Sequence, residues 1–396
     1  MSNAFETRVD RRDRGNLKAL AFTPAHIREA GYVSFAGAEF EFPTAPAVIE
    51  AVQAAAGNGL FGYTVADAPY FDAVRWWLAR VRQAEVPADW ICPVQGTIFA
   101  VATAIRLLTR PGESVAVFTP GYNRYEQAAA RLGRGTVRVP LDGAGQPDLA
   151  ALAAALERPD CRLLVFSNPN NPTGQLIPAG TLREILRLAR RRGAAVVSDE
   201  IFADVVWAGG PTPLLAALAE EGDAALSLIS LGKTFSLTGV NHADALIRNP
   251  VLRARFLRQR DADHFGSIDP LAYAALRGGY SPAGLRWLEE LKTVIWRNDQ
   301  RFLDFFAAHL PSARALRPMG TYVLWADLSG LGLADEALHR FLREEAYFCC
   351  DPGQEFYGGP GTVRICTAVP PGELEKSLAV LAAALERRFG KEREQS

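Results

Sequence analysis

Lysine is scarce in this chain of 396 residues, and nearly all of its positive charge comes from arginine. The lysines are Lys18, Lys233, Lys292, Lys376 and Lys391. Chemistry that needs a primary amine is therefore restricted to very few positions. Lys18 and Lys391 lie in charged terminal segments and Lys292 and Lys376 in helical patterns, so we expect these four to be solvated. Lys233 instead directly follows an apolar run that is typical of a buried strand.

Three further absences exclude whole classes of protein. The formal net charge is −1, from 44 acidic and 43 basic residues, which leaves no basic surface for nucleic acid or for an anionic membrane. No apolar run is long enough to span a bilayer, and the charged N-terminus has no signal-peptide core. The five cysteines are scattered, without the paired spacing of a disulfide framework or a zinc site. We expect a cytoplasmic protein with reduced core thiols, no metal, no nucleic-acid partner and no membrane contact.

What the sequence does contain is an alternation of short apolar runs with helical patterns. The runs that predict strands begin at Ser114, Cys161, Ala194, Ala224 and Ala243. Between two of them, residues 181–193 repeat apolar side chains at helical spacing and stop at a glycine. Strands that are apolar throughout and separated by helices predict an α/β fold with a mostly parallel, doubly wound sheet.

The last hundred residues have a different pattern. A long helix is expected around 287–309, a second near 334–346, and a closing helix carries leucines on one stripe, with short strands between them. This pattern predicts a smaller α+β domain. The expected organisation is an N-terminal arm (1–45) packing with the small domain, a large domain (46–285) and a C-terminal small domain (286–396).

Lys233 stands in "SLGKTFSLTG", which raises the question of a phosphate-binding P-loop. That motif requires a first glycine at position 227, where this chain has Ser227, so a P-loop is excluded on spacing. The rival is a lysine that forms a Schiff base with a carbonyl cofactor, for which the amine must be desolvated and fixed at a loop facing a pocket. Doubly wound sheets bind ligands beyond the carboxyl ends of their strands, where loops 167–174, 199–204 and 230–241 are expected to converge.

These loops carry the residue types that pyridoxal phosphate requires. Asp199 ends a predicted strand and could keep a pyridine nitrogen protonated through a charge-assisted hydrogen bond; the alternative is a helix N-cap. Asn171 could donate to the phenolic oxygen of the ring, or simply build a turn. Tyr122 could stack on the ring, or pack in the core.

A phosphate site is also predicted. Gln95, Gly96 and Thr97 precede a helical run, and the free N–H groups and the dipole at a helix start favour phosphate. Ser230, three residues before Lys233, could add a hydroxyl. Each signal is weak alone, but their order and spacing together favour a pyridoxal-phosphate site.

The segments "SNPNNPTG", "VVSDE" and "SLGKTFSLTG", in this order, resemble the fold-type I pyridoxal-phosphate enzymes, the aspartate aminotransferase superfamily. "FETRVDRRDRGNLK", "AEFEFPTAPAVIEAV", "TYVLWADLSGLGL" and "TVRICTA" resemble the MalY/PatB-type cysteine-S-conjugate (cystathionine) β-lyases over nearly the whole chain. The resemblance implies that Lys233 holds the cofactor as a Schiff base and that Asp199 pairs with the pyridinium. It also implies that Asn171 bonds the phenolic oxygen and that Tyr122 stacks on the ring.

The same resemblance implies how substrate and subunits are arranged. Arg364, in "TVRIC", clamps the α-carboxylate of an amino-acid substrate bidentately, with Asn171 beside it; a surface ion pair is the alternative for Arg364. Tyr63, in "FGYT", reaches from the neighbouring subunit to the cofactor phosphate and the substrate, which implies a homodimer with shared sites.

Four positions depart from the family patterns. Asn241 stands eight residues after the lysine, where aminotransferases carry a phosphate-binding arginine that the β-lyases also lack. Phe202 stands three residues after the aspartate, where aminotransferases have a tyrosine and the β-lyases a histidine, so the cofactor loses a polar neighbour. Cys366 replaces an asparagine of the β-lyases. His242 either fills its loop or replaces a lost polar contact, and we favour the filler.

The expected reaction is a pyridoxal-phosphate-dependent β-elimination from an L-cysteine S-conjugate, with Lys233 as general base and with thiol, pyruvate and ammonia as products. Transamination stays open as an alternative, as does a decarboxylating or oxidative deamination in specialised metabolism, because all three begin on the same scaffold. A regulatory role through protein contact also stays open.

Overall fold

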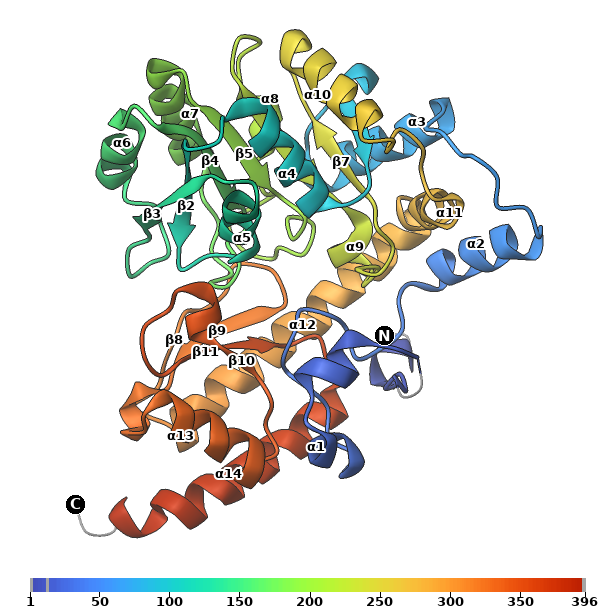
Figure 1. The fold of residues 1–396 in the computed structure, drawn as a ribbon. Helices are drawn as coiled ribbons and strands as arrows, with labels where there is room; N and C mark the ends of the chain where they lie inside the picture. Colours follow the sequence, from blue (N-terminus) through green and yellow to red (C-terminus); the bar gives the residue numbers. More distant parts are fainter. Residues whose placement is uncertain (1–2, 12–13, 394–396) are drawn as a thin grey trace.

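The computed structural model describes residues 3–11 and 14–393, whose strands form a seven-stranded and a four-stranded sheet (Figure 1). The larger sheet has the order β1-β7-β6-β5-β4-β2-β3. Its strands are β1 (Ile91–Val94), β2 (Ser114–Thr119), β3 (Gly135–Pro140), β4 (Cys161–Ser167), β5 (Ala195–Asp199), β6 (Ala225–Ile229) and β7 (Ala243–Leu246). Strands β2 to β6 run parallel, and β7 runs antiparallel to both of its neighbours. The predicted mostly parallel sheet is confirmed.

Helices cover both faces of this sheet, which explains why the inner strands β4, β5 and β6 are largely apolar, whereas the edge strand β3 is mostly exposed. In β4, Leu163 and Val165 pack with one face and Leu164 and Phe166 with the other. The first face is covered by α4 (Thr97–Leu108), α5 (Arg124–Arg131) and α10 (Pro250–Ala262), the second by α6 (Leu149–Glu157), α7 (Ala179–Arg192) and α8 (Leu215–Leu218). Because neither face meets water, alternation with polar residues is unnecessary.

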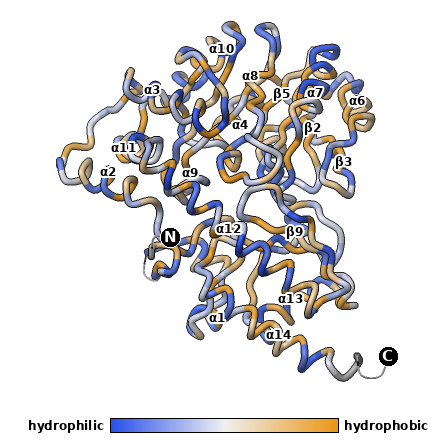
Figure 2. Tube along the Cα trace, turned by 180° about the vertical axis from the view of Figure 1, so that it is seen from behind, coloured by the Kyte–Doolittle hydropathy of each residue, from blue (hydrophilic) through white to orange (hydrophobic). Residues whose placement is uncertain are grey.

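The smaller sheet is antiparallel, with β10 (Asp351–Pro352), β11 (Thr362–Cys366), β9 (Val323–Asp327) and β8 (Arg314–Ala315) in that order. It packs with α12 (Pro282–His309), α13 (Asp335–Arg340) and α14 (Pro371–Arg393) around Phe302, Phe306 and Leu378. Helix α12 runs from the large-sheet region down to the small sheet (Figure 1), and hydrophobic and hydrophilic residues alternate along it (Figure 2). It begins four residues before the expected boundary at 286.

The N-terminal segment touches both parts of the molecule. Phe40 contacts Phe42 and Trp287 in the core that continues to the large sheet, whereas Phe35 stacks on Phe348 in the small-sheet core. The remaining α-helices are α1 (Ala25–Glu29), α2 (Pro46–Gly57), α3 (Ala68–Trp77), α9 (Leu231–Thr234) and α11 (Pro270–Gly279). Short 3-10 or π-helical turns span 3–6, 18–22, 78–82, 88–90, 329–331, 341–345 and 353–356.

No helix in residues 3–11 and 14–393 is both long and apolar enough to cross a membrane. The five cysteines all fall within these ranges and are buried and free, as expected of core thiols.

Candidate active site

Four neighbouring parallel strands end at the same edge of the large sheet, and each leads to one of the predicted residues. Lys233 follows β6, Asp199 closes β5, Asn171 follows β4 and Tyr122 follows β2. Because β6, β5, β4 and β2 are adjacent in that order, their carboxyl-terminal loops converge, as the sequence predicted.

Lys233 lies in the single turn of α9 and is partly buried. Its Nζ donates a hydrogen bond to the carbonyl oxygen of Ala38 at 2.9 Å and lies 5.5 Å from the ring centroid of Phe202. Among the described residues it forms no ion pair with a carboxylate. Desolvation, followed by the positive charge of Arg364, lowers the pKa of Lys233 to about 8. An amine of this kind is partly neutral near neutral pH and therefore nucleophilic.

Asp199 is buried at the end of β5, with both carboxylate oxygens engaged. The hydroxyl of Tyr125 donates to Oδ2 at 2.7 Å and the backbone N–H of Ile201 donates to Oδ1 at 3.2 Å. Residues 201–204 form turns and no helix begins at Asp199, so the helix N-cap interpretation is wrong. Burial raises the pKa of Asp199 to about 6, although the hydrogen bonds and Lys233 oppose the shift. This carboxylate would be stabilised by a cationic N–H group.

Arg364 is buried in β11 and uses three of its nitrogens. Nη1 donates to Oδ1 of Asn171 at 2.9 Å, while Nε and Nη2 donate to Oδ2 of Asp351 at 2.9 and 2.6 Å. The guanidinium also lies over the ring of Phe356, 4.2 Å from its centroid. The surface-ion-pair alternative is wrong, because this ion pair is buried. The site thus joins a loop of the large sheet to the small sheet.

Asp351 was missed as a site residue by sequence reasoning. It stands directly opposite Arg364 in the β10–β11 ladder and accepts a further hydrogen bond from the N–H of Gly37 at 3.0 Å. An acidic residue between the apolar "YFCC" and a proline was the available signal. Recognising it required the strand register, which the sequence does not give.

Of the residues predicted to bind phosphate, some have groups open to an anion and others are already hydrogen-bonded within the protein. Gly96 has φ = 102°, a conformation that favours glycine, and no side chain of the described residues caps α4, which starts at Thr97. The first N–H groups of α4 are therefore open to an anion. Gln95 donates from Nε2 to the carbonyl of Ser267 at 3.4 Å. The hydroxyl of Ser230 donates to the carbonyl of His242 at 2.7 Å, so in this structure it has no proton to offer a phosphate.

Of the predicted ring neighbours, Tyr122 packs edge-on against Tyr125 with centroids 5.5 Å apart. Phe202 is buried with its ring 5.1 Å from that of Tyr322 in an edge-on contact, which leaves the floor beside Lys233 apolar. Cys366 lies with Sγ 3.4 Å from the carbonyl oxygen of Glu39.

The interpretation of His242 as a loop filler is wrong. Its side chain is buried and Nε2 lies 2.8 Å from the hydroxyl of Tyr70, which itself donates to Oδ1 of Asp244 at 2.6 Å. His242 is therefore part of a buried polar network that ties the loop after Lys233 to α3.

Tyr63 is not brought to Lys233 within one chain. Its side chain is fully exposed on the segment between α2 and α3, beside a cavity of about 740 Å³ that Gln95, Asn241 and Ser267 also line. The cavity lies next to the open start of α4.

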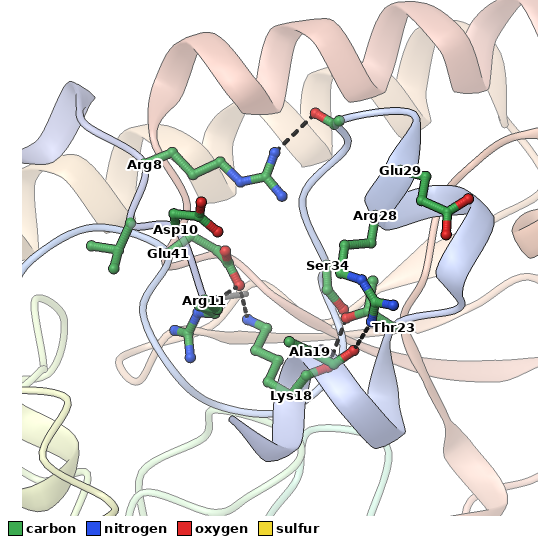
Figure 3. Close-up of a pocket in the computed structure, with 12 residues that line it drawn as sticks. Arg8, Asp10, Arg11, Lys18, Ala19, Thr23, Arg28, Glu29, Ser34 and Glu41 are labelled. Carbon is green, nitrogen blue, oxygen red and sulfur yellow. Dashed lines mark hydrogen bonds and ion pairs between the residues drawn. The ribbon is translucent and has the colours of Figure 1, made fainter. Parts of the chain in front are cut away.

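The expectation that Lys18 is solvated is wrong. Its side chain is 1% exposed, and Nζ lies 2.9 Å from Oε1 of Glu41 and donates to the carbonyl of Glu39 at 3.0 Å. Figure 3 shows Lys18, Arg11 and Glu41 directed toward one another beside a cavity of about 290 Å³. Burial lowers the pKa of Lys18, but the charge of Glu41, its hydrogen bond and the nearby Cys366 together outweigh this effect, and the net shift of the pKa is upward.

Sequence and structure comparisons agree with this geometry. The model of the family "Aminotransferase class I and II" matches residues 31–381, so the chain belongs to that family. The chain is 29% identical to cystathionine beta-lyase PatB of Bacillus subtilis, over 88% of this chain and 91% of PatB. It is 30% identical to protein MalY of Escherichia coli, over 90% and 92% of the two chains.

Among solved structures, the chain resembles cystalysin from Treponema denticola, whose crystal structure contains a pyridoxal 5′-phosphate cofactor. The TM-score is 0.90 at 27% identity, over 98% of this chain and all of that one. Within the family, the chain falls in the MalY/PatB branch of fold-type I enzymes, as its motifs predicted.

Proposed function

We propose that this protein is a pyridoxal-phosphate-dependent C–S β-lyase that acts on L-cysteine S-conjugates of the cystathionine type. The observation that carries the proposal is a lysine without a carboxylate ion-pair partner, with a pKa of about 8, at the sheet edge that carries Asp199 and that Arg364 of the small sheet reaches through Asn171. The similarity to PatB, which is named a cystathionine beta-lyase, supports this reaction over others on the same fold.

The donor set fits pyridoxal phosphate. Lys233 offers an amine for the aldehyde, and the buried carboxylate of Asp199 suits the pyridine N–H. Because Oδ1 of Asn171 accepts from Arg364, the amide can turn its Nδ2–H groups toward the phenolic oxygen. The uncapped start of α4, at Gly96 and Thr97, suits the phosphate. Tyr122 lies at the neighbouring strand end and is the ring available for stacking.

Arg364 binds the α-carboxylate of the substrate in this mechanism. Asp351 holds Nε and Nη2 from one side, which fixes the plane of the guanidinium and leaves the Nη edge beside Asn171 for the substrate. The substrate's Cα is thereby oriented toward Lys233. Orientation of this kind is a large part of the rate enhancement in enzymes generally.

Lys233 moves the proton. When bound, pyridoxal phosphate supplies an electron sink for the electron pair left at Cα. Neutral Nζ of Lys233 takes the Cα proton, the Cβ–S bond breaks, and the sulfur leaves with the bonding pair as a thiolate. Hydrolysis of the remaining unsaturated amino acid consumes one water and gives pyruvate and ammonia. Asp199 keeps its negative charge toward the pyridine N–H throughout.

We further propose a homodimer in the cytoplasm. The segment that carries Tyr63 exposes Leu60, Phe61 and Val65 beside the 740 Å³ cavity, a concentration of exposed apolar side chains that suits a subunit contact. In such a dimer Tyr63 reaches the partner's phosphate site. The free cysteines suit a reducing compartment.

Transamination is the second candidate, because the matching family is that of the class I and II aminotransferases. It starts with the same proton removal by Lys233, but the amino group of the substrate would then stay with the enzyme, and a keto acid would have to accept it before the next turnover. The two reactions therefore differ in whether a keto acid is consumed.

The test uses purified protein with and without L-cystathionine or an S-alkyl-cysteine. The lyase proposal predicts the visible absorption band of lysine-bound pyridoxal phosphate, and pyruvate plus free thiol without any added keto acid. Lys233→Ala is the matched control and should show neither. Product formation that depends on an added keto acid would replace the lyase by an aminotransferase, and a wild-type protein without the absorption band would overturn both.

A further inference from the structure

We propose that Tyr125 is a positioning residue whose hydroxyl fixes the carboxylate of Asp199 in the orientation that receives the cofactor's pyridine N–H. This inference rests on the proposed function, because it assigns Asp199 its partner. Tyr125 was not among the residues that the motifs predicted. It comes from α5, the helix that follows the loop of Tyr122, and reaches the strand end across the sheet edge.

The contact is short and completely buried. The Tyr125 hydroxyl donates to Oδ2 of Asp199 at 2.7 Å, within the range of charge-assisted O–H···O⁻ bonds, and the tyrosine is 2% exposed. The N–H of Ile201 holds the other oxygen. With one donor on each oxygen, rotation of the carboxylate about its last bond breaks a hydrogen bond in either direction.

Tyr125 is itself oriented by the loop that carries the substrate-binding groups. The hydroxyl of Ser167, the last residue of β4, hydrogen-bonds to Tyr125, and the N–H of Asn171 donates to Oγ of Ser167 at 3.0 Å. Each donor in this chain points toward Asp199, an arrangement in which successive hydrogen bonds strengthen one another. Through Asn171 the chain continues to Arg364. Asn171 therefore links the two ends of the site: its side chain contacts Arg364, and its backbone N–H begins the hydrogen bonds that lead to Asp199.

The hydroxyl also sets how basic Asp199 is. Burial disfavours its ionised form, and the hydrogen bond from Tyr125 is the largest influence in the opposite direction. The other titratable groups that act on Asp199 are Lys233, which favours the charge, Glu200, which opposes it, and Tyr122 at the edge of the site. Removal of the Tyr125 hydroxyl should therefore make Asp199 harder to ionise, even though no packing is lost.

The test compares Tyr125→Phe with wild type and with Tyr280→Phe. Tyr280 is a similarly buried tyrosine, stacked on Trp77 away from the site, so it controls for loss of a buried hydroxyl. The affinity of each apoprotein for pyridoxal phosphate is measured by equilibrium titration between pH 5 and 9. Binding needs an ionised Asp199, so affinity should fall at acid pH. Pyridoxal phosphate itself also ionises in this pH range, but its ionisation contributes equally to every protein and cancels when the variants are compared with wild type.

For Tyr125→Phe we expect the acid fall in affinity to move upward by about one pH unit, since a hydrogen bond to a charged group is of that strength. Tyr280→Phe should leave it unchanged. An unshifted profile for Tyr125→Phe would overturn the positioning role. If Tyr125→Phe does not fold, Ser167→Ala should give a smaller shift in the same direction, and no shift would equally overturn it. Failure of wild type to bind the cofactor would instead refute the proposed function.

Discussion

Two lysines of this chain, Lys18 and Lys233, are removed from solvent, but their pKa values shift in opposite directions. Lys18 is fully buried and lies against Glu41, so it stays charged and its pKa rises. Lys233 is partly buried and has a backbone carbonyl as its partner, so its pKa falls to about 8. Burial alone therefore does not identify a reactive amine; the difference is whether a carboxylate lies in direct contact with the amine, as Glu41 does with Lys18.

The two environments are joined by one short segment. The carbonyl of Ala38 accepts from Lys233, while the carbonyl of Glu39 and the carboxylate of Glu41 hold Lys18. The side chain of Glu39 accepts from Thr238, in the loop that follows Lys233. Lys18 thus fixes the backbone of residues 38–41, and the carbonyl of Ala38 in this segment accepts the hydrogen bond from Lys233.

The largest expected effect is on catalytic activity, which should depend on Lys233 and not on Lys18. Lys233→Ala should lower kcat for thiol release by at least about 10²-fold, the lower end of the contribution of a general base, because the proton acceptor is gone. The matched double variant Lys18→Met/Glu41→Leu replaces the ion pair by apolar groups and should keep most of the activity. Steady-state thiol assays measure both, and comparable losses in the two proteins would contradict the division of roles.

The next effect concerns stability. Glu41→Gln leaves the Lys18 charge buried without its partner, which should lower the free energy of unfolding by about 3–5 kcal/mol. Adding Lys18→Met to this variant should restore most of the loss, because the fully buried ammonium group is then gone and Arg11 keeps its ion pair with Glu39. Urea denaturation monitored by tryptophan fluorescence gives both values. If the single and double variants are equally unstable, the ion pair between Lys18 and Glu41 does not stabilise the N-terminal arm.

The pH dependence of cofactor capture sharpens the contrast further. The neutral amine of Lys233 is the nucleophile, and its lowered pKa means that the neutral fraction grows as pH rises through about 8. The rate at which apoprotein captures pyridoxal phosphate should therefore increase from pH 7 to about 9 and then level off. Stopped-flow absorbance measures this rate. An increase that continues to pH 10.5, the ordinary value for lysine, would show that Lys233 is not perturbed.

The contrast also extends to a buried carboxyl group, whose effect is spread over several pH units. Asp299, in α12, is buried, and burial raises its pKa well above the usual value, with the Thr367 hydroxyl only partly opposing the shift. Because the folded-state pKa is the higher one, stability is fully present below the unfolded value near 3.8 and falls as pH rises. The fall is up to about 1.4 kcal/mol per pH unit. Asp299→Asn should flatten that slope in urea titrations between pH 5 and 8; an unchanged slope would show that Asp299 is ionised.

Much of the fold was predictable from local pattern. Strands β2, β4, β5 and β6 are apolar on both faces because helices cover both, and this produces continuous apolar runs that can be recognised without knowledge of the tertiary structure. The turn residues after β4 and β5 mark strand ends for equally local reasons. Lys233, Asp199 and Asn171 could therefore be placed at one sheet edge from the sequence.

What the sequence did not reveal depends on contacts between distant segments. Lys18 looked solvated because its immediate neighbours are charged, but Glu41 and the backbone of Glu39, more than twenty residues later, enclose it. Asp351 and Tyr125 become site residues through strand register and through the approach of α5 to β5. His242 looked like a filler because Tyr70, its partner, lies 172 positions away.

The most direct test is borohydride reduction of the cofactor-loaded protein followed by peptide mass spectrometry. Reduction makes the bond between pyridoxal phosphate and a lysine permanent, so it records which amine is reactive. We expect a pyridoxyl adduct on the peptide containing Lys233 and an unmodified peptide containing Lys18. An adduct on Lys18, or none on Lys233, would contradict the conclusion that the missing carboxylate partner makes Lys233 the catalytic amine.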